Sequence, residues 1–224
     1  MTDRRERLNA AQVQEADLDD WRQIQGRIKA RFRTRDFATG LALVNRIGAA
    51  AEEANHHPDI TLTYTDLVVT LSSHDVRGIT SRDIDLARQI TAFAAELQVP
   101  SEPSGLTQLE LGLDTAAGEH LAPFYAALLG SGLVDGEPVD PTGQVPTLWW
   151  QDPHESDEVA DLPDQSPQQR WHFDVWVARD EAERRVQAAL HAGGRLVSDA
   201  EAPAYWVLED DDGNRSCICT PVGR

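Results

Sequence analysis

The sequence predicts an α+β protein with two modules: an N-terminal antiparallel sheet covered by two helices on one face, and a C-terminal domain with a tandem βαβββ-type repeat. Strand and helix patterns follow one another in the order β-β-α-β-β-α before residue 98. The stretch QVPSEPSG, residues 98–105, then combines prolines, serines and a glycine. After it, a strand–helix–strand pattern occurs twice. We therefore expect a first domain over residues 1–98, a linker over 99–105 and a second domain over 106–224.

The first module opens with a hairpin and a helix. Residues 21–34 alternate apolar and polar side chains around Gly26, which predicts two strands. Residues 35–55 predict a helix with Asp36 as its N-cap. Its apolar stripe is expected to be Phe37, Leu41, Val44, Ile47 and Ala51. The ring of Pro58 disfavours helical geometry at the residue before it, so the helix ends at or before the pair of histidines there.

Two further strands and a second helix complete this module. Residues 60–73 contain two short strand patterns that turn near Thr65 and Asp66. Residues 80–98 predict an amphipathic helix with Thr80 or Ser81 as its cap. Because antiparallel strands alternate with two amphipathic helices, both helices are expected on one face of the sheet.

The second module shows its repeat in the order of its elements. We expect, in order, a strand at 106–115, a helix at 118–129, strand segments in GEPVD and PTLWWQ, a strand at 170–178, a helix at 180–194 and a hairpin at 203–220. Residues 152–169 lie between the two repeats, and their acidic, proline-containing sequence predicts a solvated connection. Two such units in tandem indicate an internal duplication around a shared cleft.

Charge and composition exclude several classes of protein. The net charge is −18, and residues 99–224 carry 23 acidic against 7 basic side chains. Because such a surface repels phosphate backbones, we expect no nucleic-acid partner. No apolar run approaches the roughly 18 residues of a membrane span, and the charged N-terminus lacks the apolar core of a secretion signal. We therefore expect a cytoplasmic protein without a membrane partner, with Cys217 and Cys219 as free thiols.

The most informative motif begins with EEANHHPDI, residues 52–60. The whole pattern is E-x3-H-H-P-x5-Y-x9-H-x8-D, formed by Glu52, His56, His57, Pro58, Tyr64, His74 and Asp83. The end of the first helix and the end of the following strands are expected near the same loop edge of the sheet. His56, His57 and His74 are therefore expected to converge on one pocket, with Glu52 one helical turn before His56 on the same face.

This pattern resembles the signature of the pterin-4a-carbinolamine dehydratases, and residues 8–97 are similar to that family throughout. The resemblance implies dehydration of a 4a-hydroxytetrahydropterin substrate to quinonoid dihydropterin, without a metal or an organic cofactor. It implies that His56 and His74 form the acid–base pair and that His57 assists. Imidazole suits this role because its unperturbed pKa is about 6.5. The implied substrate-binding residues are Glu52, Ser73, Asp75 and Asp83, of which Glu52 and Asp83 can also fix imidazole tautomers.

Other interpretations of the motif stay open. Three imidazoles can bind zinc, although the adjacent His56 and His57 point in different directions. Each histidine or carboxylate alone can be a structural polar residue, and Tyr64 is more typical of a core aromatic than of a substrate contact. The same fold can also act as a dimerising, protein-binding accessory whose chemistry is vestigial. We expect a homo-oligomer in either case.

Residues 106–224 resemble the glyoxalase and bleomycin-resistance superfamily, also called vicinal oxygen chelate proteins, through LELGLDTAAGEHLAPFYAALLG, WHFDVWVARDEAERRVQAALHAGG and EDDDGNRSCICT. The resemblance implies a divalent metal held by two ligands from each repeat. The matching positions are Gln108, Gln151, His172 and Cys217. Two amides, one imidazole and one thiol suit hard metals poorly, so we expect none there. The domain is expected to bind an unknown small ligand or to regulate the first module; its own activity as a lyase, dioxygenase or drug-binding protein is the alternative.

Overall fold

A computed structural model describes residues 4–129, 131–143, 145–152, 170–210 and 213–222. It contains two compact units, residues 1–106 and residues 107–224, each of which is described by itself. Among the described residues, no helix is both long and apolar enough to cross a membrane. Both cysteines are free thiols.

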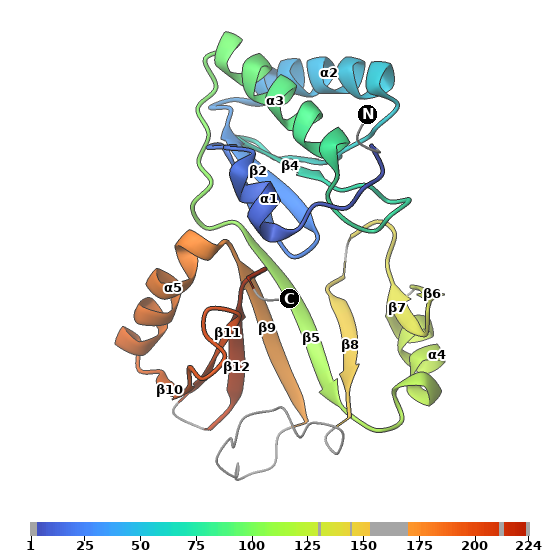
Figure 1. The fold of residues 1–224 in the computed structure, drawn as a ribbon, viewed down its shortest axis with the longest axis vertical. Helices are drawn as coiled ribbons and strands as arrows, with labels where there is room; N and C mark the ends of the chain where they lie inside the picture. Colours follow the sequence, from blue (N-terminus) through green and yellow to red (C-terminus); the bar gives the residue numbers. More distant parts are fainter. Residues whose placement is uncertain (1–3, 130, 144, 153–169, 211–212, 223–224) are drawn as a thin grey trace. The chain divides into compact units, whose positions relative to one another are not determined.

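The first unit is built on a four-stranded antiparallel sheet with the order β1-β2-β4-β3. Its strands are β1 (Trp21–Ile24), β2 (Arg27–Arg33), β3 (Asp59–Leu62) and β4 (Asp66–Leu71). Helices α2 (Phe37–Ala54) and α3 (Ser81–Glu96) lie side by side on one face of this sheet (Figure 1). This arrangement confirms the predicted α+β fold. A short helix, α1 (Ala10–Glu15), was not predicted; Asn9 and Gln12 close a reciprocal cap at its start.

The core of the first unit lies between the sheet and the two helices. Phe32, Leu43, Ile47, Leu67 and Ile90 are fully buried in it. Burial of such large apolar side chains contributes about 1.5–3 kcal/mol each to folding before entropy is subtracted, so this layer holds α2 and α3 in place. Those two helices in turn position the residues of the candidate site.

The apolar stripe predicted for α2 is partly wrong. Phe37 and Leu41 are 49% and 45% exposed, whereas the buried face of the helix consists of Gly40, Leu43, Ile47, Ala50 and Ala51. Gly40 explains the rotation, because a Cβ at that position would lie 2.5 Å from Cδ1 of Leu62. The helix therefore approaches the sheet most closely at its glycine, and the large side chains on either side of it are turned outward.

Residues 100–102, within the stretch predicted as a linker, are hydrogen-bonded to β2. The amide of Arg33 donates to the carbonyl of Pro100 at 2.9 Å, and the amide of Glu102 donates to the carbonyl of Arg31 at 2.7 Å. These bonds fasten the end of the first unit to its own sheet.

The second unit contains the two predicted βαβββ repeats. The first repeat is β5 (Thr107–Asp114), α4 (Gly118–Leu129), β6 (Gly132–Val134), β7 (Glu137–Val139) and β8 (Thr147–Gln151). The second repeat is β9 (Trp171–Val177), α5 (Arg179–His191), β10 (Arg195–Ser198), β11 (Tyr205–Glu209) and β12 (Arg215–Cys219). The main sheet has the order β10-β11-β12-β9-β5-β8, and β6 pairs with β7 separately (Figure 1).

Strand pairing makes the duplication explicit. In each repeat the first strand is parallel to the last, β5 to β8 and β9 to β12. The two repeats meet where β5 and β9 run antiparallel, which places Gly112 opposite His172. Side chains alternate between the two faces of a strand. One face of the sheet is covered by helix α5, which packs with an apolar cluster that includes Val177, Trp206 and Ile218. The alternate, polar side chains of β9 and β12 therefore lie on the opposite face.

Candidate active site of the first unit

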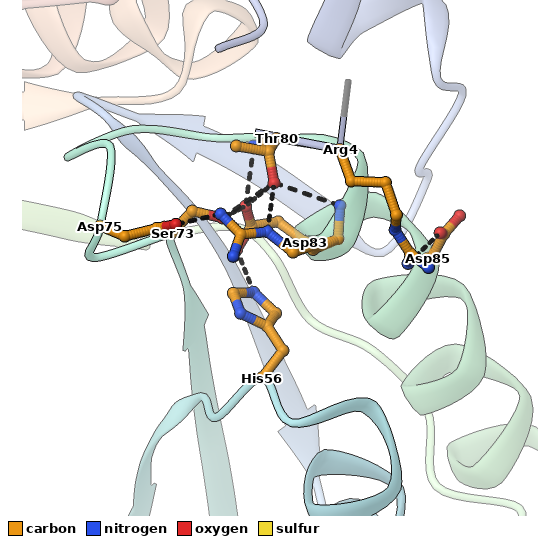
Figure 2. Close-up of polar contacts among 8 residues, drawn as sticks. Arg4, His56, Ser73, Asp75, Thr80, Asp83 and Asp85 are labelled. Atoms are coloured by element: carbon orange, nitrogen blue, oxygen red, sulfur yellow. Dashed lines mark hydrogen bonds and ion pairs between the residues drawn. The ribbon is translucent and has the colours of Figure 1, made fainter. Parts of the chain in front are cut away.

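The end of helix α2 turns His56 toward the interior of the first unit. Asn55 caps the helix in the left-handed conformation, with φ 47° and ψ 44°. The amide of His56 then donates to the carbonyl of Ala51 at 3.1 Å. This reversal directs the imidazole toward the start of α3, where it is only 7% exposed (Figure 2).

Asp83, in the first turn of α3, is the hydrogen-bond partner of the His56 ring. Its Oδ1 lies 2.7 Å from Nε2 of His56, and the carboxyl is fully buried. Its Oδ2 accepts hydrogen bonds from the hydroxyl of Ser73 at 2.7 Å and from the amide of Thr80 at 2.8 Å. Thr80 is the N-cap of α3, as predicted, so the residue that starts the helix also fixes the carboxylate.

These contacts favour the ionised form of Asp83. Burial by itself raises the pKa of Asp83, but hydrogen bonds from His56, Thr80 and Ser73 outweigh it, and the pKa lies below its usual value. The carboxyl is therefore ionised at neutral pH and accepts the Nε2–H of His56. In the neutral ring this leaves Nδ1 as the nitrogen with the lone pair.

His56 lines a cavity of about 470 Å³ between α2 and α3. The charged residues around it are Arg4, Glu53, Arg82, Asp85 and Arg88. Nη2 of Arg4 lies 3.1 Å from Oδ2 of Asp85, so that guanidinium is held at the rim by an ion pair (Figure 2). The cavity is lined mainly by polar and charged residues, and of the buried His–Asp pair only His56 lines it.

Arg82 connects a further predicted residue to this site. Its Nη2 donates to Oδ1 of Asp75 at 2.6 Å, and its Nε donates to Oγ1 of Thr80 at 3.3 Å. The Arg82 side chain lowers the pKa of Asp75, which is exposed. Sequence reasoning did not select Arg82, although it directly precedes Asp83 at the start of the helix.

His57 and His74 lie apart from the buried pair. Nε2 of His57 is 3.2 Å from Oε1 of Glu52, and both residues are exposed. The predicted approach of Glu52 to His56 is therefore wrong, because the chain leaves the helix at Asn55 and the i, i+4 relation no longer holds. His74 is exposed in the turn that follows β4, next to Ser73. Neither histidine lines the cavity at His56.

The structure thus brings together His56, Asp83 and Ser73 directly, and Asp75 through Arg82. Besides Arg82, the network contains Thr80, which the sequence identified only as a possible helix cap. Tyr64 is 74% exposed, so its interpretation as a core aromatic is wrong.

A buried His–Asp pair beside a polar cavity, on an antiparallel sheet under two helices, is an arrangement compatible with acid–base chemistry. Comparison with known proteins names the family. The profile described as pterin 4 alpha carbinolamine dehydratase matches residues 6–93, and the profile described as glyoxalase-like domain matches residues 110–219. The chain belongs to the pterin-4a-carbinolamine dehydratase family through its first unit, and its second unit is glyoxalase-like.

Individual relatives match the first unit. A provisionally named pterin-4-alpha-carbinolamine dehydratase of Thermosynechococcus vestitus is 43% identical over 91 residues, which are 40% of this chain and 96% of the relative. One of Nocardia farcinica, with the same provisional name, is 45% identical over 78 residues, 35% of this chain and 82% of the relative. A crystal structure from Brucella melitensis, titled transcriptional coactivator/pterin dehydratase, is 32% identical, covers 40% of this chain and 99% of its own, and has a TM-score of 0.39.

Proposed function

We propose that the first unit dehydrates 4a-hydroxytetrahydropterins to quinonoid dihydropterins, with His56 as an acid–base residue. The observation that carries the proposal is the buried 2.7 Å contact between Nε2 of His56 and Asp83, at the wall of the cavity. Family membership supports the choice of substrate class.

The reaction breaks the C4a–O bond and removes the proton from N5, so that water and the quinonoid product leave. The tautomer of His56 suits the removal step: Nδ1 can take the N5 proton while Asp83 holds Nε2–H and balances the positive charge on the ring. We assign the second proton transfer, to the leaving hydroxyl, to His74 on the basis of family membership. His74 is exposed and can draw a proton from solvent, but it lies outside the cavity at His56, so the substrate must reach both places. His57, with Glu52, assists at the rim.

The remaining predicted residues take different roles in this proposal. Ser73 is a positioning residue, because its hydroxyl contacts Asp83 and Thr80 rather than the cavity. Asp83 likewise acts through His56. Arg82 lines the cavity and can contact the substrate there. Asp75 would take part in substrate binding through its hydrogen bond with Arg82.

The test is the decay of absorbance of 4a-hydroxytetrahydropterin in the presence of the full-length protein. Wild type should accelerate the decay above the uncatalysed rate, and His56→Ala and His74→Ala should both be slower. His191→Ala is the matched control, because His191 is an exposed histidine at the end of α5 in the other unit. Equal rates in wild type, His56→Ala and His74→Ala would contradict the proposal and favour a non-catalytic, protein-binding accessory.

We further propose that the glyoxalase-like unit binds a small ligand and that the protein is a cytoplasmic homo-oligomer. Light scattering after size-exclusion chromatography measures the oligomeric state directly. A monomer across the working concentration range would contradict that part.

A further inference from the structure

Among the described residues of the second unit, several buried polar atoms have no hydrogen-bond partner. Three such atoms, Oδ1 of Asp114, Nε1 of Trp149 and Nδ1 of His172, come from the adjacent strands β5, β8 and β9. Folded proteins leave few buried polar atoms unpaired, because each costs about 1–3 kcal/mol. The oxygen of Asp114 and the ring nitrogen of His172 can each be satisfied by a cation or a donor, whereas the N–H of Trp149 needs an acceptor. The first two atoms indicate a place where a bound group could supply the missing contacts.

Gly112 is the residue that makes room for the cluster. It pairs with His172 on one side and with Trp149 on the other. The imidazole lies over the glycine, since a Cβ there would be 2.4 Å from Cε1 of His172. The ring is packed edge-on against Trp149, with ring centres 5.5 Å apart. The imidazole is therefore held in a defined place in the middle of the sheet.

Two other potential ligands stand beside this ring. Asp174 follows His172 by two residues on β9 and thus shares its face of the sheet. Cys217 is the register partner of Asp174 on the parallel strand β12. One ligand atom from each of His172, Asp174 and Cys217 lies within 4.8 Å of the other two. Imidazole, carboxylate and thiolate are the side chains from which zinc sites are made.

The spacing within the cluster also fits a metal. Nδ1 of His172 is 3.3 Å from Oδ1 of Asp174 but is not aligned for a hydrogen bond with it. Two ligands that are each about 2.0–2.1 Å from a tetrahedral zinc ion lie about 3.3–3.4 Å from each other. Nε2 of the same ring is 3.6 Å from Oδ1 of Asp114. A carboxylate on the far nitrogen is the usual outer partner that orients a metal-bound histidine.

The charges beside the ring favour a cation. Oδ1 of Asp174 lies 3.3 Å from Nδ1 of His172, and Oδ1 of Asp114 lies 3.6 Å from its Nε2, so carboxylates stand on two sides of the imidazole. A divalent ion bound at the ring would be attracted by both of them.

We propose that His172, Asp174 and Cys217 form a binding site for a zinc-like divalent cation, with Asp114 as the outer partner of the histidine and Gly112 as the residue that admits its ring. The site goes beyond the dehydratase function of the first unit. The proposed site departs from the expectation from the sequence, which was that this unit holds no metal because the four matching positions include Gln108 and Gln151. It keeps His172 and Cys217 from those positions and adds Asp174. All three donors come from the second repeat, and the thiol selects zinc-like ions over hard ones.

The test is metal binding by the full-length protein after it has been stripped with a chelator. Titration with Zn²⁺ should reach about one ion per chain. Titration with Co²⁺, a spectroscopic substitute, should give the near-ultraviolet absorption of a thiolate ligand. Cys217→Ser should lose that absorption. Cys219→Ser is the matched control and should keep it, because Cys219 lies two residues further along β12 and outside the donor cluster.

Asp174→Asn should weaken Zn²⁺ binding by at least about tenfold while it preserves the shape of the side chain. Circular dichroism checks the fold of each variant. A further readout needs no substitution: bound Zn²⁺ should slow the reaction of Cys217 with a disulfide reagent in the wild-type protein. Stripped protein that takes up neither ion, or a Co²⁺ spectrum that survives Cys217→Ser, would overturn the proposal. Either result would leave the dehydratase assay unaffected.

Discussion

His56 and His172 each lie next to a buried aspartate, Asp83 and Asp174 respectively, yet the hydrogen bonding around the two rings differs. Around His56 the network is complete: both oxygens of Asp83 are used, by the imidazole on one side and by Ser73 and Thr80 on the other. Around His172 the carboxylate oxygens lie 3.3 and 3.6 Å from the ring nitrogens, and within the described part of the chain several buried polar atoms have no partner. A complete network orients a side chain for chemistry, whereas an incomplete one indicates a site that a ligand completes.

The largest effect is expected from removal of the oriented ring. His56→Ala should lower kcat of the dehydratase reaction by about 10²–10⁴-fold, the usual contribution of a positioned acid or base. Binding of the pterin should change less, because the cavity walls remain. Steady-state kinetics with separate kcat and KM values measures the difference, and an unchanged kcat would contradict the role of His56.

Asp83→Asn should have the next largest effect, since it keeps the shape but removes the charge that holds Nε2–H. We expect kcat to fall by about 10–100-fold. Urea unfolding should also show a loss of about 1–3 kcal/mol, because the donors from Ser73 and Thr80 lose a charged acceptor. A variant with wild-type kcat and lower stability would make Asp83 a purely structural residue.

Gly112→Ala tests the proposed metal site at His172 without changing any of the ligand atoms. The added Cβ would displace the ring of His172. We expect Zn²⁺ affinity to drop by about tenfold or more, as for changes in the groups that orient a ligand. Isothermal titration of the stripped protein measures it. The matched control is Leu111→Val, because Leu111 is the residue next to Gly112 and points to the opposite face of the same strand.

A smaller effect is expected from Ser73→Ala. It removes one of the hydrogen bonds to Oδ2 of Asp83 but leaves Thr80 in place. The free energy of unfolding should fall by about 1–2 kcal/mol, and kcat should change by less than about threefold. A loss of kcat as large as that of His56→Ala would mean that Ser73 contacts the substrate directly.

The pH dependence of stability gives the smallest signal. Because the folded-state pKa of Asp83 is lowered, its ionised form stabilises the native protein above its unfolded-state pKa, about 3.9. That stabilisation is lost as pH falls through the lowered folded-state value. The difference in unfolding free energy between wild type and Asp83→Asn should therefore be constant near neutral pH and shrink below about pH 4. A difference in unfolding free energy that grows on acidification would contradict a lowered pKa of Asp83 in the folded state.

The sequence predicted most of what is local in the candidate site. Pro58 indicated where α2 ends, and the residues around Thr80 indicated where α3 begins. The prediction of the Glu52 contact failed because the backbone leaves the helix at Asn55, which is left-handed. As a result, Glu52 contacts His57 instead of His56. Helical spacing carries no information beyond the last turn of a helix.

The sequence also did not predict the contacts between segments that are far apart in the chain. The duplication in the second unit was visible as a repeated pattern, and the pairing of its first and last strands agrees with it. The approach of Cys217 to Asp174, however, depends on the parallel register of two strands separated by a helix and two further strands. Nothing in the spacing of those residues encodes that register.

A double-mutant cycle in the dehydratase assay is the most direct test of whether the buried pair works as one unit. The rates to compare are those of wild type, His56→Ala, Asp83→Asn and the double variant. If Asp83 acts through the imidazole, the double variant should be no slower than His56→Ala alone. Losses that multiply in the double variant would show independent roles and contradict the assignment.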